Sequence, residues 1–102
     1  MDTDTRPEIL KRLQTSEGHL RAILEMVRAG RPCEEILHQL NALQGALRAA
    51  GCQLIQCQLR ESQSIILAAS TPGIRAAELK RLHSLYTLFT QFSDRNNEVI
   101  HE

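Results

Sequence analysis

The sequence predicts an all-α fold of three helices with one long central helix. Apolar residues recur at alternating steps of three and four from residue 33 to about residue 64, which is the spacing of one helix face. Aromatic residues make up only 3% of the chain, so the core has to be built from leucine, isoleucine and alanine, which favours helix-on-helix packing. Two firm breaks, Gly30-Arg31-Pro32 and Thr71-Pro72-Gly73, divide this single domain of residues 1–102 into three segments.

The first predicted helix runs from Pro7 to about Ala29. Proline suits a first helical turn, and Asp4 or Thr5 can cap it. Its apolar residues lie mostly on one face: Ile9, Leu10, Leu13, Leu20, Ile23, Leu24 and Val27. Glycine followed by proline then ends the helix.

The second predicted helix runs from Cys33 to about Ser64, with apolar character continuing to about Ser70. Its stripe consists of Cys33, Ile36, Leu40, Leu43, Leu47, Ala50, Leu54 and Cys57. Such a helix is roughly 48 Å long, whereas a compact chain of this length has a radius of gyration of about 13 Å. We therefore predict that the stripe packs against a second copy of itself in an antiparallel dimer, with the crossing near Gly45.

The third predicted helix runs from Ile74 to about Phe92, and residues 93–102 are expected to be frayed or weakly helical. The chain carries 12 basic and 12 acidic residues, so its net charge does not indicate a nucleic-acid-binding protein. The acidic, polar start and the absence of a long apolar run predict neither a signal peptide nor a membrane anchor. Because the number of cysteines is odd, at three, and no export signal is expected, we predict reduced thiols in the cytoplasm. No arrangement typical of a catalytic site is present, so we do not expect an enzyme.

Cys33 is the candidate reactive residue, because it lies in the first turn of a helix, where the dipole favours the thiolate. In an antiparallel dimer it faces the Cys57 end of the partner, which gives two hypotheses for Cys57: a thiol pair or ligand site between chains, or simple packing. Cys52 is interpreted as packing against the first helix. The four histidines show no ligand spacing with one another.

Five basic residues are candidates for one DNA-binding face: Lys11, Arg12, Arg21, Arg48 and Arg60. A dimer or tetramer multiplies these side chains into several phosphate contacts. A solvated surface of mixed charge is the competing interpretation, since glutamates are interspersed.

Two segments carry a resemblance to a known family. LKRLQTSEGHLRAIL and RAGRPCEEILHQLNALQGALRAAGCQLIQCQLRES together resemble the CsoR/RcnR-like repressors that sense copper, nickel or cobalt, formaldehyde or persulfide. The resemblance implies an antiparallel helical dimer, in some members a dimer of dimers. It also implies that operator DNA is bound until an inducer reaches a site between subunits.

The resemblance places Cys33 on the family's first ligand and reactive thiol. It places Gln58 and Ser62 on the partner's ligand positions, usually histidine and then cysteine or histidine, so the usual Cu(I) site and the second persulfide cysteine are missing. Either Cys57 substitutes as a ligand for Cu(I) or another soft metal, or Cys33 acts alone, or nothing is sensed. Gln14, Thr15 and Gln44 replace basic residues, and His19 replaces a glutamine at a position we assign to allosteric coupling.

The predicted function is therefore DNA-binding transcriptional repression by a homodimer or homotetramer. Its operator affinity is gated by metal binding or thiol modification at an inter-subunit site centred on Cys33. The alternative is a degenerate sensor scaffold that no longer binds DNA and acts as a thiol- or metal-binding interaction protein. Salt-sensitive DNA binding separates the two.

Overall fold

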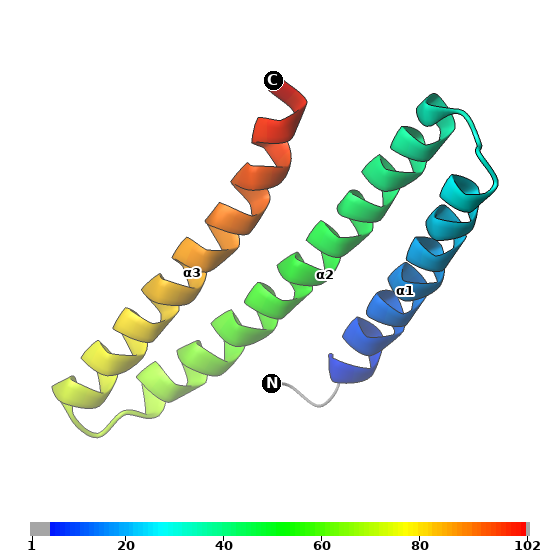
Figure 1. Cartoon of the computed structure of the whole chain (residues 1–102). Coiled ribbons are helices and arrows are strands. Elements are labelled where there is room, and N and C mark those ends of the chain that lie inside the picture. Colours follow the sequence, from blue (N-terminus) through cyan, green and yellow to red (C-terminus); the bar gives the residue numbers. More distant parts are fainter. Residues whose placement is uncertain (1–4, 102) are drawn as a thin grey trace.

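A computed structural model describes the backbone of residues 5–101 and the side chains of residues 5–93. It consists of α1 (Arg6–Arg28), α2 (Cys33–Ala68) and α3 (Pro72–His101), with no strand in the described part of the chain. The three helices lie side by side in one layer with α2 in the middle, and α1 and α3 contact α2 but not each other (Figure 1). None of the described helices is both long and apolar enough to cross a membrane.

The structure confirms the three-helix division, with turns at the two predicted breaks, but two helices are longer than expected. Gly30 adopts a φ of 68° in the α1–α2 turn, a conformation that favours glycine. Thr71 caps α3, since its Oγ1 accepts a hydrogen bond from the Ile74 amide at 3.3 Å, and Pro72 takes the first helical position. The end predicted near Ser64 for α2 is wrong, because the helix continues to Ala68. The end predicted near Phe92 for the third helix is also too early, because the backbone of α3 is helical to His101; the fraying of residues 93–102 stays a prediction.

The protomer is only one helix thick. Its principal extents are 60 × 32 × 13 Å and its radius of gyration is 18.0 Å, well above the roughly 13 Å of a compact domain of about 100 residues. It exposes 7597 Å² of surface, about 1,800 Å² more than expected for a compact monomer of 11.5 kDa. Among residues 5–93, a single layer buries few apolar side chains, so much apolar surface stays open.

The apolar stripe of α2 divides between two environments. Leu43, Ala50 and Cys57 are buried, at 7%, 2% and 2% exposure. They repeat every seven residues and lie near the side of α2 that carries Gln39, which is bonded to His19 of α1. Leu40, Leu47 and Leu54, each one turn away, remain 37%, 36% and 39% exposed. The predicted packing of the whole stripe against a second copy is therefore wrong for the buried half, which packs within the protomer.

The apolar face of α1 divides in the same way. Ile9 and Ile23 are buried together with Ser16, at intervals of seven residues. A neighbouring stripe of larger side chains stays exposed: Leu10, Leu13, Leu20, Leu24 and Val27. Both helices therefore present a second apolar stripe that the protomer does not cover.

Two glycines of α2 give a paired prediction for stability. Gly45 lies about 200° around the helix from Leu43 and Leu47, away from the apolar stripe, and a Cβ there meets no atom within 4 Å. The crossing predicted at Gly45 therefore has no support, and Gly45→Ala should stabilise the protein by up to about 1 kcal/mol through helix propensity alone. At Gly51 a Cβ would lie 3.3 Å from Phe92 Cε1, so Gly51→Ala should gain less or lose stability. Thermal unfolding of the two variants measures the difference, and an equal gain would contradict the close approach of α3.

Candidate inter-subunit site

An apolar groove of about 580 Å³ runs along α2, between α1 and α3. It combines residues of both halves of the α2 stripe with one residue of α1 and the apolar face of the C-terminal half of α3. Its lining residues are Leu13, Leu47, Ala50, Gly51, Leu54, Ile55, Cys57, Gln58, Leu85, Leu88, Phe89 and Phe92. Gln58 is the only polar side chain among them, at one end of the leucine row.

A chain of hydrogen bonds leads from Gln58 to α3. Gln58 Nε2 donates to Ser62 Oγ at 3.0 Å, and Ser62 Oγ donates to Glu78 Oε1 at 2.7 Å. Ser62 is completely buried and Glu78 is 9% exposed, while Arg81 Nη1 lies 3.6 Å from the same carboxylate oxygen. The structure thus joins two predicted site residues to Glu78, which sequence analysis missed. Sixteen residues and a turn separate Ser62 from Glu78, so no local spacing relates them.

Cys33 lies far from these residues within one protomer. It is exposed at the first position of α2, beside an ion pair in which Arg31 Nη2 lies 2.7 Å from Glu35 Oε2. Twenty-five residues of continuous helix place Cys33 roughly 37 Å from Gln58. One chain alone cannot bring the two positions together.

The other two cysteines occupy different sides of α2. Cys57 lies at the floor of the apolar groove and is 2% exposed, which suits a packing role, and its pairing with a partner's Cys33 stays a prediction. Cys52 is half-buried and precedes Leu59 by seven residues, so it lies on the same side as Leu59 and faces α3 rather than α1. The predicted packing of Cys52 against the first helix is not what the structure shows.

A polar groove of about 350 Å³ lies at the junction of α1 and α2. It is lined by Glu8, Lys11, Arg12, Thr15, Ser16, His19 and Ala46. His19 Nε2 and Gln39 Oε1 form a hydrogen bond of 2.8 Å between α1 and α2. The groove therefore combines two of the predicted DNA-binding cations with the predicted coupling residue.

The other three predicted cations do not line this groove. Arg60 donates from Nη2 to Thr5 Oγ1 at 3.1 Å, and it follows Ala46 of the polar groove by 14 residues, which places it on nearly the same side of α2. Arg21 follows Arg12 by nine residues, on the opposite side of α1, and pairs with Glu17 at 3.7 Å. Arg48 is half-buried, and its Nε has no hydrogen-bond partner in the described part of the chain.

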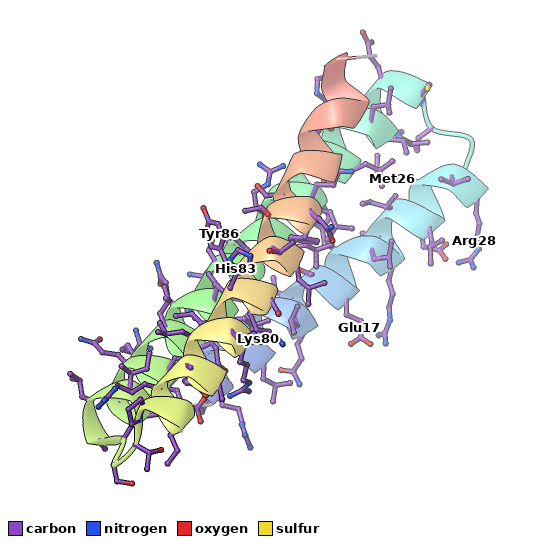
Figure 2. All side chains as sticks on the ribbon, turned by 90° about the vertical axis from the view of Figure 1, so that its left-hand side faces the viewer. Glu17, Met26, Arg28, Lys80, His83 and Tyr86 are labelled. Carbon is purple, nitrogen blue, oxygen red and sulfur yellow. The ribbon has the colours of Figure 1, made fainter. Side chains whose placement is uncertain are left out.

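A smaller apolar groove of about 300 Å³ lies on the other side of the α2–α3 contact. It is lined by Ile55, Leu59, Leu79, Leu82, His83 and Tyr86. Tyr86 is 60% exposed, and it projects from α3 on the same side as His83 (Figure 2). The layer therefore carries apolar surface on both of its faces.

The predicted metal site can be tested on its donor atoms. Soft metal ions prefer thiolate and imidazole ligands, whereas positions 58 and 62 supply an amide and a hydroxyl that are already hydrogen-bonded to each other. Among the residues that the structure describes, no three His, Cys, Asp or Glu side chains gather closely enough to hold a metal ion. Gln58 and Ser62 therefore supply no ligand of the kind that a soft metal prefers.

Comparison of the sequence with known proteins gives two kinds of match. The family model described as metal-sensitive transcriptional repressor matches residues 5–89. The copper-sensing transcriptional repressor RicR of Mycobacterium tuberculosis is 30% identical over 71 residues, covering 70% of this chain and 74% of RicR. The copper-sensing transcriptional repressor CsoR of Mycobacterium ulcerans is 38% identical over 48 residues, covering 47% of this chain and 41% of CsoR.

Comparison of the structure with solved structures gives the same fold. The nickel-responsive transcriptional regulator InrS superposes with a TM-score of 0.73 at 30% identity, over 81% of this chain and 90% of InrS. A variant of the formaldehyde-responsive regulator FrmR from Salmonella enterica serovar Typhimurium superposes with a TM-score of 0.71 at 22% identity, over 86% of this chain and 97% of FrmR. At that identity the second likeness supports the fold alone.

Proposed function

The chain belongs to the family of metal-sensitive transcriptional repressors, and on this premise we propose that it represses transcription by binding operator DNA as a homodimer. The family consists of transcriptional regulators rather than enzymes. The proposed control point is an inter-subunit site at which Cys33 of one protomer meets Gln58 and Ser62 of the other. Chemistry at this site changes how the two protomers pack, and with it the spacing of their DNA-binding faces.

The dimer is supported by the surface that one protomer leaves open. The excess of about 1,800 Å² over a compact monomer is the area that a large, obligate interface takes from each partner. The apolar groove lies where a second α2 helix packs between α1 and α3. Apolar residues on the other face, around Tyr86, provide a second surface through which two dimers form a tetramer.

The groove also suggests the register of the pairing. Leu40, Leu47 and Leu54 form the exposed row of α2, so an antiparallel pair centred on Leu47 places Leu40 opposite the partner's Leu54. In that register Cys33 lies opposite residue 61 of the partner, between Gln58 and Ser62. The two halves of the candidate site, roughly 37 Å apart in one chain, then meet twice in the dimer.

Coupling from this site to the rest of the assembly uses the hydrogen-bond chain. An event at Cys33 acts on Gln58, whose amide is bonded through Ser62 to Glu78 on α3. The C-terminal half of α3 supplies Leu85, Leu88, Phe89 and Phe92 to the apolar groove. A shift of α3 therefore alters the surface on which the partner helix rests.

The DNA-binding face is the pair of polar grooves, one from each protomer. Lys11 and Arg12 lie in each groove, and Arg60 lies on the same side of the α1–α2 junction. Two-fold symmetry presents these cations twice, which fits two half-sites of an operator. His19 joins this groove to α2 through Gln39, which supports its role in coupling.

Fluorescence anisotropy on the chain's own upstream DNA, across a salt series, tests the proposal. Reduced, metal-free protein should bind with an affinity that falls steeply with salt. Lys11→Ala/Arg12→Ala should flatten the slope of log K against log salt by up to about 3.6, since the dimer loses four phosphate contacts of about 0.9 each. Arg28→Ala, an exposed arginine on the same helix paired with Glu25, is the matched control and should leave the slope unchanged.

Two other results would redirect the assignment. An equal loss on Arg21→Ala would show that DNA contacts both sides of α1 and that the polar groove is not the whole face. No binding by the natural chain at low salt would exclude DNA recognition and leave the interaction scaffold. Two observations favour that alternative: Arg48 is half-buried, and the acidic Glu8 lies in the polar groove.

A further inference from the structure

The hydrogen-bond chain at the inter-subunit site is already complete without a ligand. Ser62 has one proton, which it donates to Glu78 Oε1 at 2.7 Å, and its oxygen accepts from Gln58 Nε2 at 3.0 Å. Ser62 has no exposed surface, and Glu78 is 9% exposed. Recruiting Ser62 to any bound group would remove the closest hydrogen bond of a buried carboxylate.

Two thiols are near the site that the dimer brings together: Cys33, which is exposed, and Cys57, which is 2% exposed and lies about 100° around α2 from Gln58. In the register proposed above, each site receives the thiol of Cys33 from one protomer, and the amide of Gln58, the hydroxyl of Ser62 and the carboxylates of Glu61 and Glu78 from the other. Cu(I) and Ni(II) sensors need several thiolate or imidazole ligands, and Zn(II) takes three or four protein ligands of sulfur, nitrogen or carboxylate type. Here the carboxylate of Glu78 is held by Ser62 and lies beside Arg81.

We propose that the inter-subunit site of this chain has no metal function, because Gln58, Ser62 and Glu78 form a closed hydrogen-bonded chain where metal ligands would have to stand. The DNA affinity of the protein is then independent of Cu(I), Ni(II) and Zn(II), unlike that of a metal sensor. The inference rests on the pairing in the proposed function only for the place of Cys33. The donor chemistry of residues 58, 62 and 78 is independent of that pairing.

Metal competition on the full-length reduced protein tests the inference directly. Cu(I), Ni(II) and Zn(II) are titrated against chromophoric chelators, with Cys33→Ser as the matched variant. The natural chain and Cys33→Ser should compete equally weakly, which excludes Cys33 from any site formed by the other cysteines. One equivalent of metal per protomer, bound tightly by the natural chain and lost in Cys33→Ser, would overturn the proposal.

A gain-of-binding variant provides the second arm. Gln58→His/Ser62→Cys places an imidazole and a thiolate four residues apart on one face of α2, and should bind Cu(I) at least 100-fold more tightly than the natural chain. Adding Cys33→Ser should abolish that gain. A double variant with natural helical content but no gain would show that these positions are not what the site lacks, and would overturn the proposal.

These measurements need no DNA, so they fail or succeed separately from the proposed function. If the protein does not bind DNA, the repressor assignment is lost while the titration still decides the metal question. If it does bind DNA, anisotropy with and without each metal gives a second readout. A metal-induced loss of affinity of tenfold or more that requires Cys33 would overturn the inference.

Discussion

We expect Leu54→Glu to break the dimer into monomers that lose much of their helical structure. Leu54 is 39% exposed in the protomer and lines the apolar groove, where the proposed register places it against the partner's Leu40. Two glutamates per dimer would be buried in this groove without a partner charge, at a cost of about 4 kcal/mol or more. The dimer dissociation constant should therefore rise at least about 1,000-fold.

Sedimentation velocity and far-ultraviolet circular dichroism measure the two parts of this result. Leu67→Glu is the matched control, because Leu67 also belongs to α2, is 79% exposed and lies outside the apolar groove. That variant should remain a helical dimer. Equal behaviour of the two variants would place the interface on another surface and would remove the register centred on Leu47.

Ser62→Ala should destabilise the protein by about 1–3 kcal/mol, because it leaves the buried Glu78 carboxylate without its 2.7 Å donor. The 3.6 Å approach of Arg81 offsets only part of that loss, since Arg81 is largely exposed. For a domain of this size, each 1 kcal/mol lowers the melting temperature by roughly 4–8 °C. Differential scanning calorimetry at fixed protein concentration measures the shift.

Ser64→Ala is the control for the hydroxyl itself. Ser64 lies on the same helix, and its Oγ donates to its own chain at the Arg60 carbonyl at 3.2 Å on the exposed surface. Its substitution should change the melting temperature by little. If Ser62→Ala were equally harmless, the hydrogen-bond chain would not be the tie between α2 and α3, and the coupling route to the apolar groove would have to be sought elsewhere.

The helical architecture could be predicted from the sequence because its determinants are local. The Gly30 turn, the Thr71-Pro72 start and the three-and-four spacing each act within a few residues. The division of the α2 stripe could not be predicted, because Leu43 and Leu47 belong equally to a row that repeats every 3.5 residues. Only the position of α1 decides that Leu43 is buried inside the protomer and Leu47 is left open.

The candidate site was predictable only in part, for the same reason. The position of Cys33 at a helix start identifies it from the sequence alone, whereas Gln58 and Ser62 are identified only by the resemblance; all three lie on α2. Glu78 of α3 completes the hydrogen-bond chain of Gln58 and Ser62, because the turn between the helices brings it back to Ser62. The residues around Glu78 in the sequence do not indicate that its carboxylate is buried. Arg21 lies on the opposite side of α1 from Arg12, and this departure from one face could be predicted from the sequence, because nine residues separate the two.

A protomer 13 Å thick is a single layer of helices, and its exposed apolar rows need a second layer to cover them. In the proposed dimer, synthesis of one chain does not finish folding, because the exposed apolar rows of a nascent protomer stay uncovered until a second protomer binds. For a dimer that folds as it assembles, each tenfold dilution lowers the apparent stability by about 1.4 kcal/mol. The amount of folded protein in such a dimer then rises more steeply than the number of chains produced. Gene dosage would set not only how much of this protein a cell holds but also which fraction of it is folded.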